Sequence, residues 1–199
     1  MRRTVVNNIV SLDGFYADES GNPTVLNMDQ TFDAYNLERL QSAGTVLLGR
    51  TSFEGFGAYW PSIADADEDP NNRALSADNR EISRLYNRVA KVVVSDSLNV
   101  PADHPWAATT TVVRREEVGK WLEQEKVNGT GDILIFASRI MWNGLLAQGL
   151  IDELHLTISP GALTKGLPLF LQPANLSLLD VRAFPGSGNA LLRYRPASA

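Results

Sequence analysis

Cysteine is absent from this chain of 199 residues, and histidine occurs only twice. Without cysteine, the protein can form no disulfide, thiolate zinc site or iron–sulfur cluster, and it has no cysteine nucleophile. Neither histidine belongs to a catalytic or metal-binding motif. His104 lies in a proline-flanked segment, and His155 lies on the expected half-exposed face of a strand. We therefore expect structural or surface roles for both histidines, and no metal site.

Basic residues are also few. Lysine and arginine number 18 against 23 acidic residues, the formal net charge is −5, and no basic stripe is present. Nucleic-acid binding depends on clustered cations that neutralise phosphates, so nucleic acid is excluded as the main partner, whereas a bound dinucleotide needs only a local positive site. No apolar segment is long enough for a membrane helix or a signal peptide. We expect a cytoplasmic protein with no membrane partner.

Several familiar motifs are missing as well. The sequence has no Walker phosphate loop, no H-E-x-x-H, no G-x-S-x-G and no G-x-G-x-x-G. Acidic residues at 65, 67, 68 and 69 alternate as in a calcium loop, but the sixth position, which needs glycine, is Pro70, and the twelfth, which needs glutamate, is Ser76. We interpret this segment as a solvated surface loop.

What the sequence does contain is an alternation of apolar runs of strand length with amphipathic segments. Strands are expected at 5–12, 46–48, 91–95, 109–113, 132–136 and 154–159, and helices at 29–43, 78–88, 116–126 and 140–148, the first helix stopping at Gly44. Segments 178–184 and 190–195 flank P-G-S-G-N and predict a hairpin. This order predicts one α/β domain over residues 1–199, with a mostly parallel sheet and an antiparallel C-terminal edge.

Ligands of a parallel sheet collect at the carboxyl ends of its strands. Residues expected there are Ser11, Asp13-Gly14, Gly49-Arg50-Thr51-Ser52, Ser95 and Ala137-Ser138-Arg139. Glycine allows close approach of a ligand, and a helix starting at Thr51 or Ser52 would direct its free N–H groups and dipole to the same point. With Arg50 beside them, these groups predict an anion site suited to phosphate.

Polar side chains near this edge offer further candidates. Asp13, Asp29 and Asp33 could bind a polar ring or relay a proton. For Asp29 and Asp33 we favour the simpler explanation that an acid is stabilising in the first turn of a helix. Asn7 and Asn8 interrupt the first strand, and we interpret them as one exposed and one hydrogen-bonded side chain.

Four segments together resemble a known family. VSLDGFYA, LLGRTSFEGFGAYWP, KVVVSDSL and DILIFASRIMWNGLLAQGLIDELHLTISPGALTKGLPLF follow one another in this order. They resemble the dihydrofolate reductase-like superfamily, in its branch similar to the C-terminal reductase domain of the bifunctional riboflavin-synthesis deaminase–reductase. The resemblance covers nearly the whole chain. It implies a dihydrofolate reductase-like three-layer sandwich with helices on both faces of the sheet, NADPH as cofactor, and a homodimer formed across the sheet edge and C-terminal strands.

The resemblance also implies roles for particular residues. The cofactor-binding residues it implies are Gly49, Arg50, Thr51, Ser52, Ser95, Ala137, Ser138, Arg139 and Ile140, with Arg50 meeting the adenosine phosphate. The Asp13-Gly14 corner would lie beside the nicotinamide and substrate, with Phe15 and Trp60 among the substrate contacts. Asp33 falls at about the helix position of the pterin-binding carboxylate of folate reductases. Asp13 and Asp33 are therefore the candidate catalytic acids.

One departure from the family pattern concerns the second cofactor loop, which usually begins with glycine and here begins with Ala137. If φ is positive there, alanine is strained by roughly 1 kcal/mol or more, and its methyl group could displace a pyrophosphate. Cofactor binding would then be weaker than in relatives, unless the charge of Arg139 compensates.

The leading hypothesis is an NADPH-dependent reductase that passes a hydride to a C=N or C=O carbon of a small heterocyclic substrate. The nearest substrate is 5-amino-6-(5-phosphoribosylamino)uracil, but no deaminase domain accompanies the chain, so we favour a stand-alone reductase with another substrate. A non-catalytic nucleotide-binding or small-molecule-binding protein is the alternative, which Ala137 favours and the Arg50–Ser52 segment opposes. Dihydrofolate reduction is a third possibility, supported by Asp33 alone.

Overall fold

The computed structural model describes residues 1–69 and 71–197. Pro70, which breaks the calcium-loop pattern, and the last two residues of the expected domain lie outside this part. The large sheet contains eight strands in the order β5-β4-β3-β6-β1-β7-β10-β9. These are β1 (Thr4–Ser11), β3 (Ala43–Gly49), β4 (Ala90–Val94), β5 (Thr110–Val113), β6 (Asp132–Phe136), β7 (Glu153–Ser159), β9 (Leu176–Ala183) and β10 (Ala190–Pro196).

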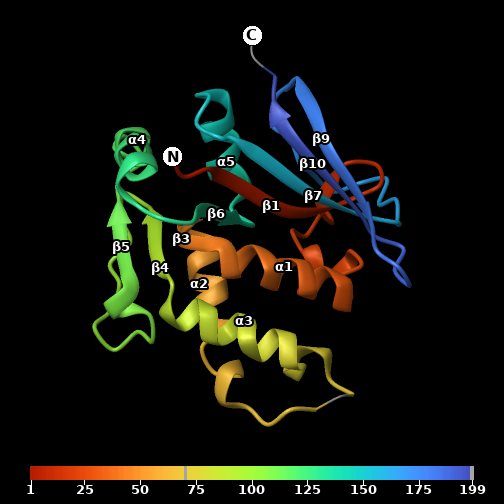
Figure 1. Ribbon diagram of the computed structural model, residues 1–199, viewed down its shortest axis with the longest axis horizontal. Helices are drawn as coiled ribbons and strands as arrows, with labels where there is room; N and C mark the ends of the chain where they lie inside the picture. Colours follow the sequence, from red (N-terminus) through yellow and green to blue (C-terminus); the bar gives the residue numbers. More distant parts are fainter. Residues whose placement is uncertain (70, 198–199) are drawn as a thin grey trace.

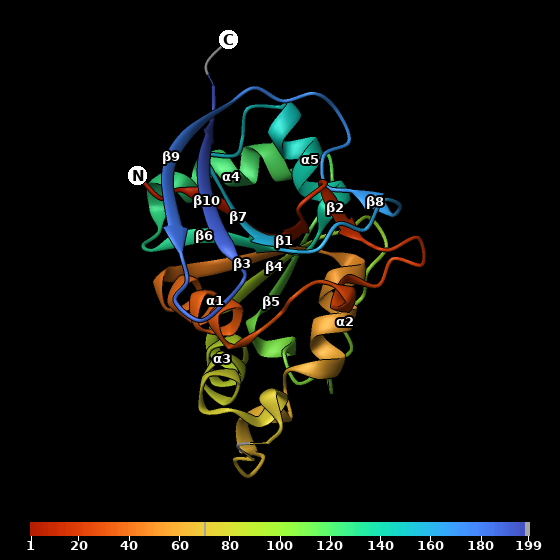
Figure 2. The same ribbon diagram turned by 90° about the vertical axis from the view of Figure 1, so that its right-hand side faces the viewer.

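The sheet is mostly parallel. Every neighbouring pair from β5 across to β7 runs parallel, whereas β10 runs antiparallel to both β7 and β9. The expected C-terminal hairpin is therefore confirmed. A second, small sheet pairs β2 (Phe15–Ala17) with β8 (Leu167–Pro168), and Figure 2 shows it apart from the large sheet. Neither of these short strands has a periodic pattern in the sequence.

Helices cover both faces of the large sheet (Figure 1). One side carries α1 (Gln30–Ser42), α2 (Arg50–Tyr59) and α3 (Ala77–Arg88), and the other carries α4 (Val118–Asn128) and α5 (Arg139–Ala147). In β6, Leu134 and Phe136 enter the core on the α1–α3 side, while Ile133 and Ile135 enter the core with Trp142 of α5. The uninterrupted apolar run of β6 thus reflects burial of both faces of a central parallel strand.

The ends of the elements differ from expectation by up to three residues. Helix α1 ends at Ser42 because Ala43 already adopts an extended conformation (φ −80°, ψ 132°), so Gly44 belongs to β3 and is not the helix stop. Glycine is needed at this position for another reason, since a Cβ on Gly44 would collide with the carbonyl oxygen of Thr130. Asp29 caps α1 by accepting hydrogen bonds from the N–H groups of Thr31 and Phe32.

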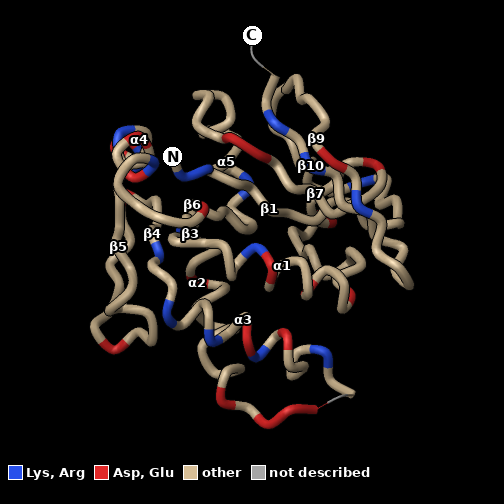
Figure 3. The backbone as a smooth tube through the Cα atoms, in the orientation of Figure 1, with Lys and Arg blue, Asp and Glu red and all other residues tan. Residues whose placement is uncertain are grey.

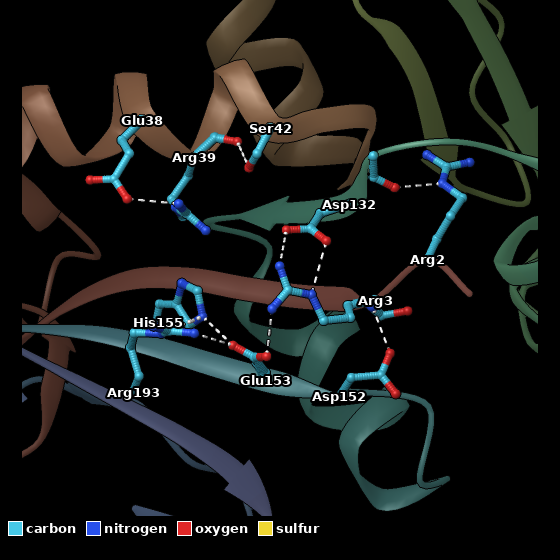
Figure 4. A network of polar contacts seen from close by, with 12 residues as sticks. Arg2, Arg3, Glu38, Arg39, Ser42, Asp132, Asp152, Glu153, His155 and Arg193 are labelled. Carbon is cyan, nitrogen blue, oxygen red and sulfur yellow. Dashed lines mark hydrogen bonds and ion pairs between the residues drawn. The ribbon is translucent and has the colours of Figure 1, made fainter. Parts of the chain in front are cut away.

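Three polar residues are more buried than the sequence predicts. His155 has 0% exposure, because Tyr35 of α1 packs over this face of β7 and Arg193 of the neighbouring strand β10 lies beside the ring, so its expected half-exposed position is wrong. Figure 4 shows it beside Glu153 and Arg193. Asn7 and Asn8 are both buried as well, so neither is the exposed member of the pair.

The acidic segment between α2 and α3 lies on a loop remote from the large sheet (Figure 3). Within the described residues, no helix has the length and apolar character needed to cross a membrane.

Candidate cofactor and substrate site

Two loops meet where β3 and β6 end side by side. The backbone N–H of Gly49 donates to Ser138 Oγ, and the backbone N–H of Ser138 donates to Ser52 Oγ, each with a donor–acceptor distance of 3.0 Å. Because β3 and β6 are parallel neighbours, the segments that follow them reach the same edge of the sheet. The structure thus brings together the two segments that the sequence singles out as an anion site.

Helix α2 begins at Arg50, directly after Gly49, and its N-terminus has no side-chain cap. Uncapped N–H groups and the helix dipole favour an anion at this point. The Arg50 guanidinium lies beside it, half exposed, and donates to Glu54 Oε1 (2.8 Å) and Ser97 Oγ (3.1 Å). Ser95 is buried, and its Oγ accepts hydrogen bonds from the N–H groups of Ser97 and Leu98. Ser95 therefore stabilises the turn that carries Ser97, the hydrogen-bond partner of Arg50.

The second loop has an unusual backbone. Ala137 and Ser138 adopt φ values of +46° and +51°. Because φ is positive at residue 137, the alanine there is strained, as the sequence predicts for this case. A left-handed conformation costs a non-glycine residue roughly 1–2 kcal/mol. The Arg139 guanidinium donates to the carbonyl oxygen of Pro168 (2.9 Å) and so ties α5 to β8, while the Ile140 side chain is 74% exposed. Strain of this kind is typical of functional loops.

A pocket of about 380 Å³ opens between α1, α2 and α3 above β1 and β6. Its walls are aromatic, with Phe32 from α1, Phe56 and Tyr59 from α2, Trp60 directly after α2, and Tyr86 from α3. Ala137 of the second loop also lines it, so the pocket and the anion site share a wall. A largely apolar cavity with a few converging polar groups is the usual form of a small-molecule site.

Asp33 is the buried acid of this pocket. Its Oδ2 accepts from Arg73 Nη1 (2.6 Å) and from Asn79 Nδ2 (2.9 Å). Burial raises the pKa of the Asp33 carboxyl, and Arg73 and Asn79 offset part of that rise. Asp33 does lie in the first turn of α1, as the simpler explanation holds, but its side chain also lines the pocket.

The Asp13-Gly14 corner lies elsewhere. Asp13 is exposed, and its carboxylate accepts from Ser11 Oγ (2.6 Å) and from the N–H groups of Leu163 and Thr164. The hydrogen bond from Ser11 is the main cause that lowers the pKa of Asp13. Asp13, Gly14 and Phe15 are not among the residues that line the pocket, whereas the expected substrate contacts Asp33 and Trp60 are. The catalytic role of Asp13 stays a prediction.

Most residues that line the pocket were not predicted as site residues, and the polar ones among them include Asn7, Asn36, Arg73 and Asn79. The sequence does single out Asn7, because an amide side chain in an otherwise apolar strand is unusual. Arg73 gave no signal, since it lies in the acidic loop, and only the fold brings that loop against α1.

The sequence matches the family model of the RibD C-terminal domain over residues 2–186. It is also 30% identical over 186 residues to the uncharacterized protein YyaP of Bacillus subtilis (strain 168), a match that covers 92% of this chain and 89% of that protein.

Solved structures share the fold. The diaminohydroxyphosphoribosylaminopyrimidine deaminase/5-amino-6-(5-phosphoribosylamino)uracil reductase of Thermotoga maritima has a TM-score of 0.66 at 14% identity, over 98% of this chain and 57% of that one. Dihydrofolate reductase from Enterococcus faecalis, solved with NADP(H), has a TM-score of 0.59 at 14% identity, over 98% and 97% of the two chains. The expected dihydrofolate reductase-like fold is confirmed. Because the family model spans nearly the whole sequence, this chain belongs to the RibD C-terminal domain family.

Proposed function

We propose that the protein is a cytoplasmic NADPH-dependent reductase that transfers a hydride to a C=N or C=O carbon of a small heterocyclic substrate. The observation that carries this proposal is the shared wall at Ala137, which joins the substrate-sized pocket to the loop beside the uncapped α2 N-terminus. Family membership supports a reductase, since the T. maritima neighbour is named as a uracil reductase. A 5-amino-6-(5-phosphoribosylamino)uracil-like ring is the nearest substrate.

The residues around the two loops fit a dinucleotide. The uncapped N-terminus of α2 and the half-exposed Arg50 offer backbone donors and a charge to phosphates. Ser52 and Ser138 add hydroxyls at the same place. NADPH, when bound, supplies the hydride, and the protein orients the reactants and excludes water.

Within the pocket, the aromatic walls would hold the ring, and Asp33 would bind it or deliver the proton that the reduced nitrogen or oxygen requires. Asp33 is the acid among the described residues that line the pocket, and burial raises its pKa toward the range of a useful proton donor.

Titration with NADPH, followed by the fluorescence of the four tryptophans, tests this proposal. Saturable binding below about 1 mM is expected, a weak threshold on the affinity scale. Loss of NADPH absorbance with pyrimidine, pterin or dihydrofolate substrates then identifies the ring. The absence of saturable binding would reject the reductase.

A binding protein without turnover is the second candidate, and one observation favours it. The N–H groups of Gly49 and Ser138 are already engaged by serine hydroxyls, so a pyrophosphate would have to compete for them. NADPH binding with no oxidation in the presence of any of these rings would support this alternative.

We also propose that the chain forms a homodimer through β9. This strand is the outer edge of the large sheet, and its Leu178, Leu179 and Val181 side chains are exposed. An edge strand with apolar side chains favours pairing with another chain. Val181→Lys should shift the mass measured by light scattering from dimer to monomer, and a monomeric wild-type protein would reject the proposal.

A further inference from the structure

The floor of the pocket carries a hydrogen-bond acceptor without a partner. Asn7 is 2% exposed, its Nδ2 donates to Asn36 Oδ1 (2.7 Å), and its own Oδ1 has no partner among the described residues. Asn7 and Asn36 both line the pocket. A buried amide oxygen without a partner is unfavourable, so a donor that reached it would bind with a gain in affinity.

The walls of the pocket favour a flat ligand. Trp60 and Tyr86 stack on each other with ring centroids 5.4 Å apart and an interplanar angle of 28°, and Phe56 meets Tyr86 edge-on. Phe32 lines the pocket from α1. Aromatic faces of this kind bind planar rings through burial of area and offset stacking.

The charges in the pocket cancel. Arg73 is the one cation among the described residues that line it, and its guanidinium is paired with Asp33 at 2.6 Å. A phosphate that bound the remaining N–H groups of Arg73 would also lie close to the Asp33 carboxylate, which would repel it. The pocket thus favours a ligand with no net charge.

We propose that this pocket binds an uncharged, planar nitrogen heterocycle that donates a ring N–H to Asn7 Oδ1. This inference rests on the proposed function, which places the substrate in the pocket, and it narrows that substrate to an unphosphorylated ring. The phosphoribosyl group of the nearest substrate guess is thereby disfavoured.

Isothermal titration calorimetry at pH 6.5 with two matched ligand pairs tests the inference. Lumazine presents ring N–H donors that 1,3-dimethyllumazine lacks, and we expect lumazine to bind about tenfold tighter or more, the effect of one well-placed hydrogen bond. Uridine should bind at least as tightly as uridine 5′-phosphate. Equal binding of the two lumazines, tighter binding of the phosphate, or no binding of any ring would overturn the inference.

Variants of Asn7 separate hydrogen bonding from the bulk of the added methyl groups. Asn7→Leu removes the acceptor at similar volume and should abolish the preference for lumazine, whereas Asn7→Asp keeps an oxygen at this position and should retain it. Circular dichroism checks that both variants fold. If Asn7→Leu does not fold, the test rests on the ligand pairs with the wild-type protein and on Asn7→Asp, which should keep the preference for lumazine over 1,3-dimethyllumazine. NADPH is titrated separately, so its failure to bind would reject the reductase without deciding which ring the pocket accepts.

Discussion

The hydroxyl of Tyr35 on α1 lies 2.8 Å from Nδ1 of His155 on β7, and both side chains are buried. The other ring nitrogen, Nε2, lies 2.8 Å from Glu153 Oε2. With Tyr35 donating to Nδ1 and Glu153 accepting from Nε2, the imidazole is neutral and both of its nitrogens are satisfied. Arg3, directly before β1, and Arg193 of β10 pair with the same Glu153, so the histidine joins α1 to this network (Figure 4).

This network predicts loss of stability in acid. Burial is the main cause that lowers the pKa of His155 from 6.5 to about 4. The unfolded chain therefore takes up a proton at higher pH than the folded one, so the stabilisation is complete above pH 6.5 and is lost as the pH falls from 6.5 toward 4. We expect about 3 kcal/mol of unfolding free energy to be lost across this range. Urea unfolding at pH 7, 6, 5 and 4 measures it.

The variant His155→Gln carries no titrating group and should flatten the pH dependence between 6.5 and 4, although its stability at pH 7 will be lower. His104→Gln, which removes the other histidine, is the matched control and should keep the slope. Below pH 4.5 all three proteins should lose further stability, because the hydrogen bond from His155 and the pairing with Arg193 and Arg3 help to hold the pKa of Glu153 at about 2, and both arginines remain in His155→Gln. An unchanged slope in His155→Gln would contradict this assignment.

Arg50 should discriminate between the two nicotinamide cofactors. If its guanidinium binds the 2′-phosphate, Arg50→Ala should weaken NADPH binding about tenfold or more and leave NADH almost unchanged, since a charge-assisted hydrogen bond contributes about 1.5–3 kcal/mol. Tryptophan fluorescence titration gives both affinities. Arg88→Ala, at another exposed arginine, which pairs with Glu81 within α3 and lies before β4, should alter neither. Equal weakening of both cofactors would exclude this role.

Much of the fold follows from sequence pattern, because a central parallel strand must be apolar on both faces. The runs Val46–Leu48 and Asp132–Phe136 are strands for this reason, and both are found. The strands β2 and β8 could not be predicted in the same way. They are three and two residues long, respectively, and are held by pairing between segments about 150 residues apart, which no local pattern records.

The candidate site, too, could be predicted from the sequence only in part. The loops that follow β3 and β6 could be placed together because parallel strands share an edge, and the hydrogen bonds between Gly49, Ser52 and Ser138 join them. The pairing of Asp33 with Arg73 could not be foreseen, since it depends on how the loop before α3 folds back on α1. Asp13, which follows β1, accepts hydrogen bonds from the backbone of Leu163 and Thr164, and its catalytic role stays a prediction.

The backbone of the second cofactor loop gives a stability prediction. Ala137 has φ of +46°, where glycine carries no steric penalty, so Ala137→Gly should raise the free energy of unfolding by about 0.5–1 kcal/mol despite the greater entropy of glycine in the unfolded chain. If the methyl group also restricts the pyrophosphate, the same variant should bind NADPH more tightly. Urea unfolding and the fluorescence titration measure the two effects.

Ala34→Gly is the matched control, because Ala34 lies exposed in the interior of α1. The same substitution in a helix should lower the free energy of unfolding by about 1 kcal/mol, the opposite sign. Destabilisation of similar size in both variants would show that the left-handed conformation at Ala137 carries little strain.

The ion pair between Asp33 and Arg73 should set the pH dependence of the proposed reduction. Burial raises the pKa of Asp33 and Arg73 lowers it, so Arg73→Gln should raise that pKa further. An acid that donates a proton works only below its pKa, and the decline of kcat/KM on the alkaline side should therefore move to higher pH in Arg73→Gln. Asp33→Asn should lose that decline together with most of the activity.

Arg80→Gln is the control for Arg73→Gln. Arg80 pairs with Glu68 of the acidic loop at 2.6 Å and is not among the residues that line the pocket, so its loss should perturb the same loop without changing the charge beside Asp33. A shift of the alkaline decline in Arg73→Gln but not in Arg80→Gln would assign the effect to the charge on residue 73. The same shift in both variants would assign it to movement of the loop, and a shift of Arg73→Gln to lower pH would exclude Asp33 as the proton donor.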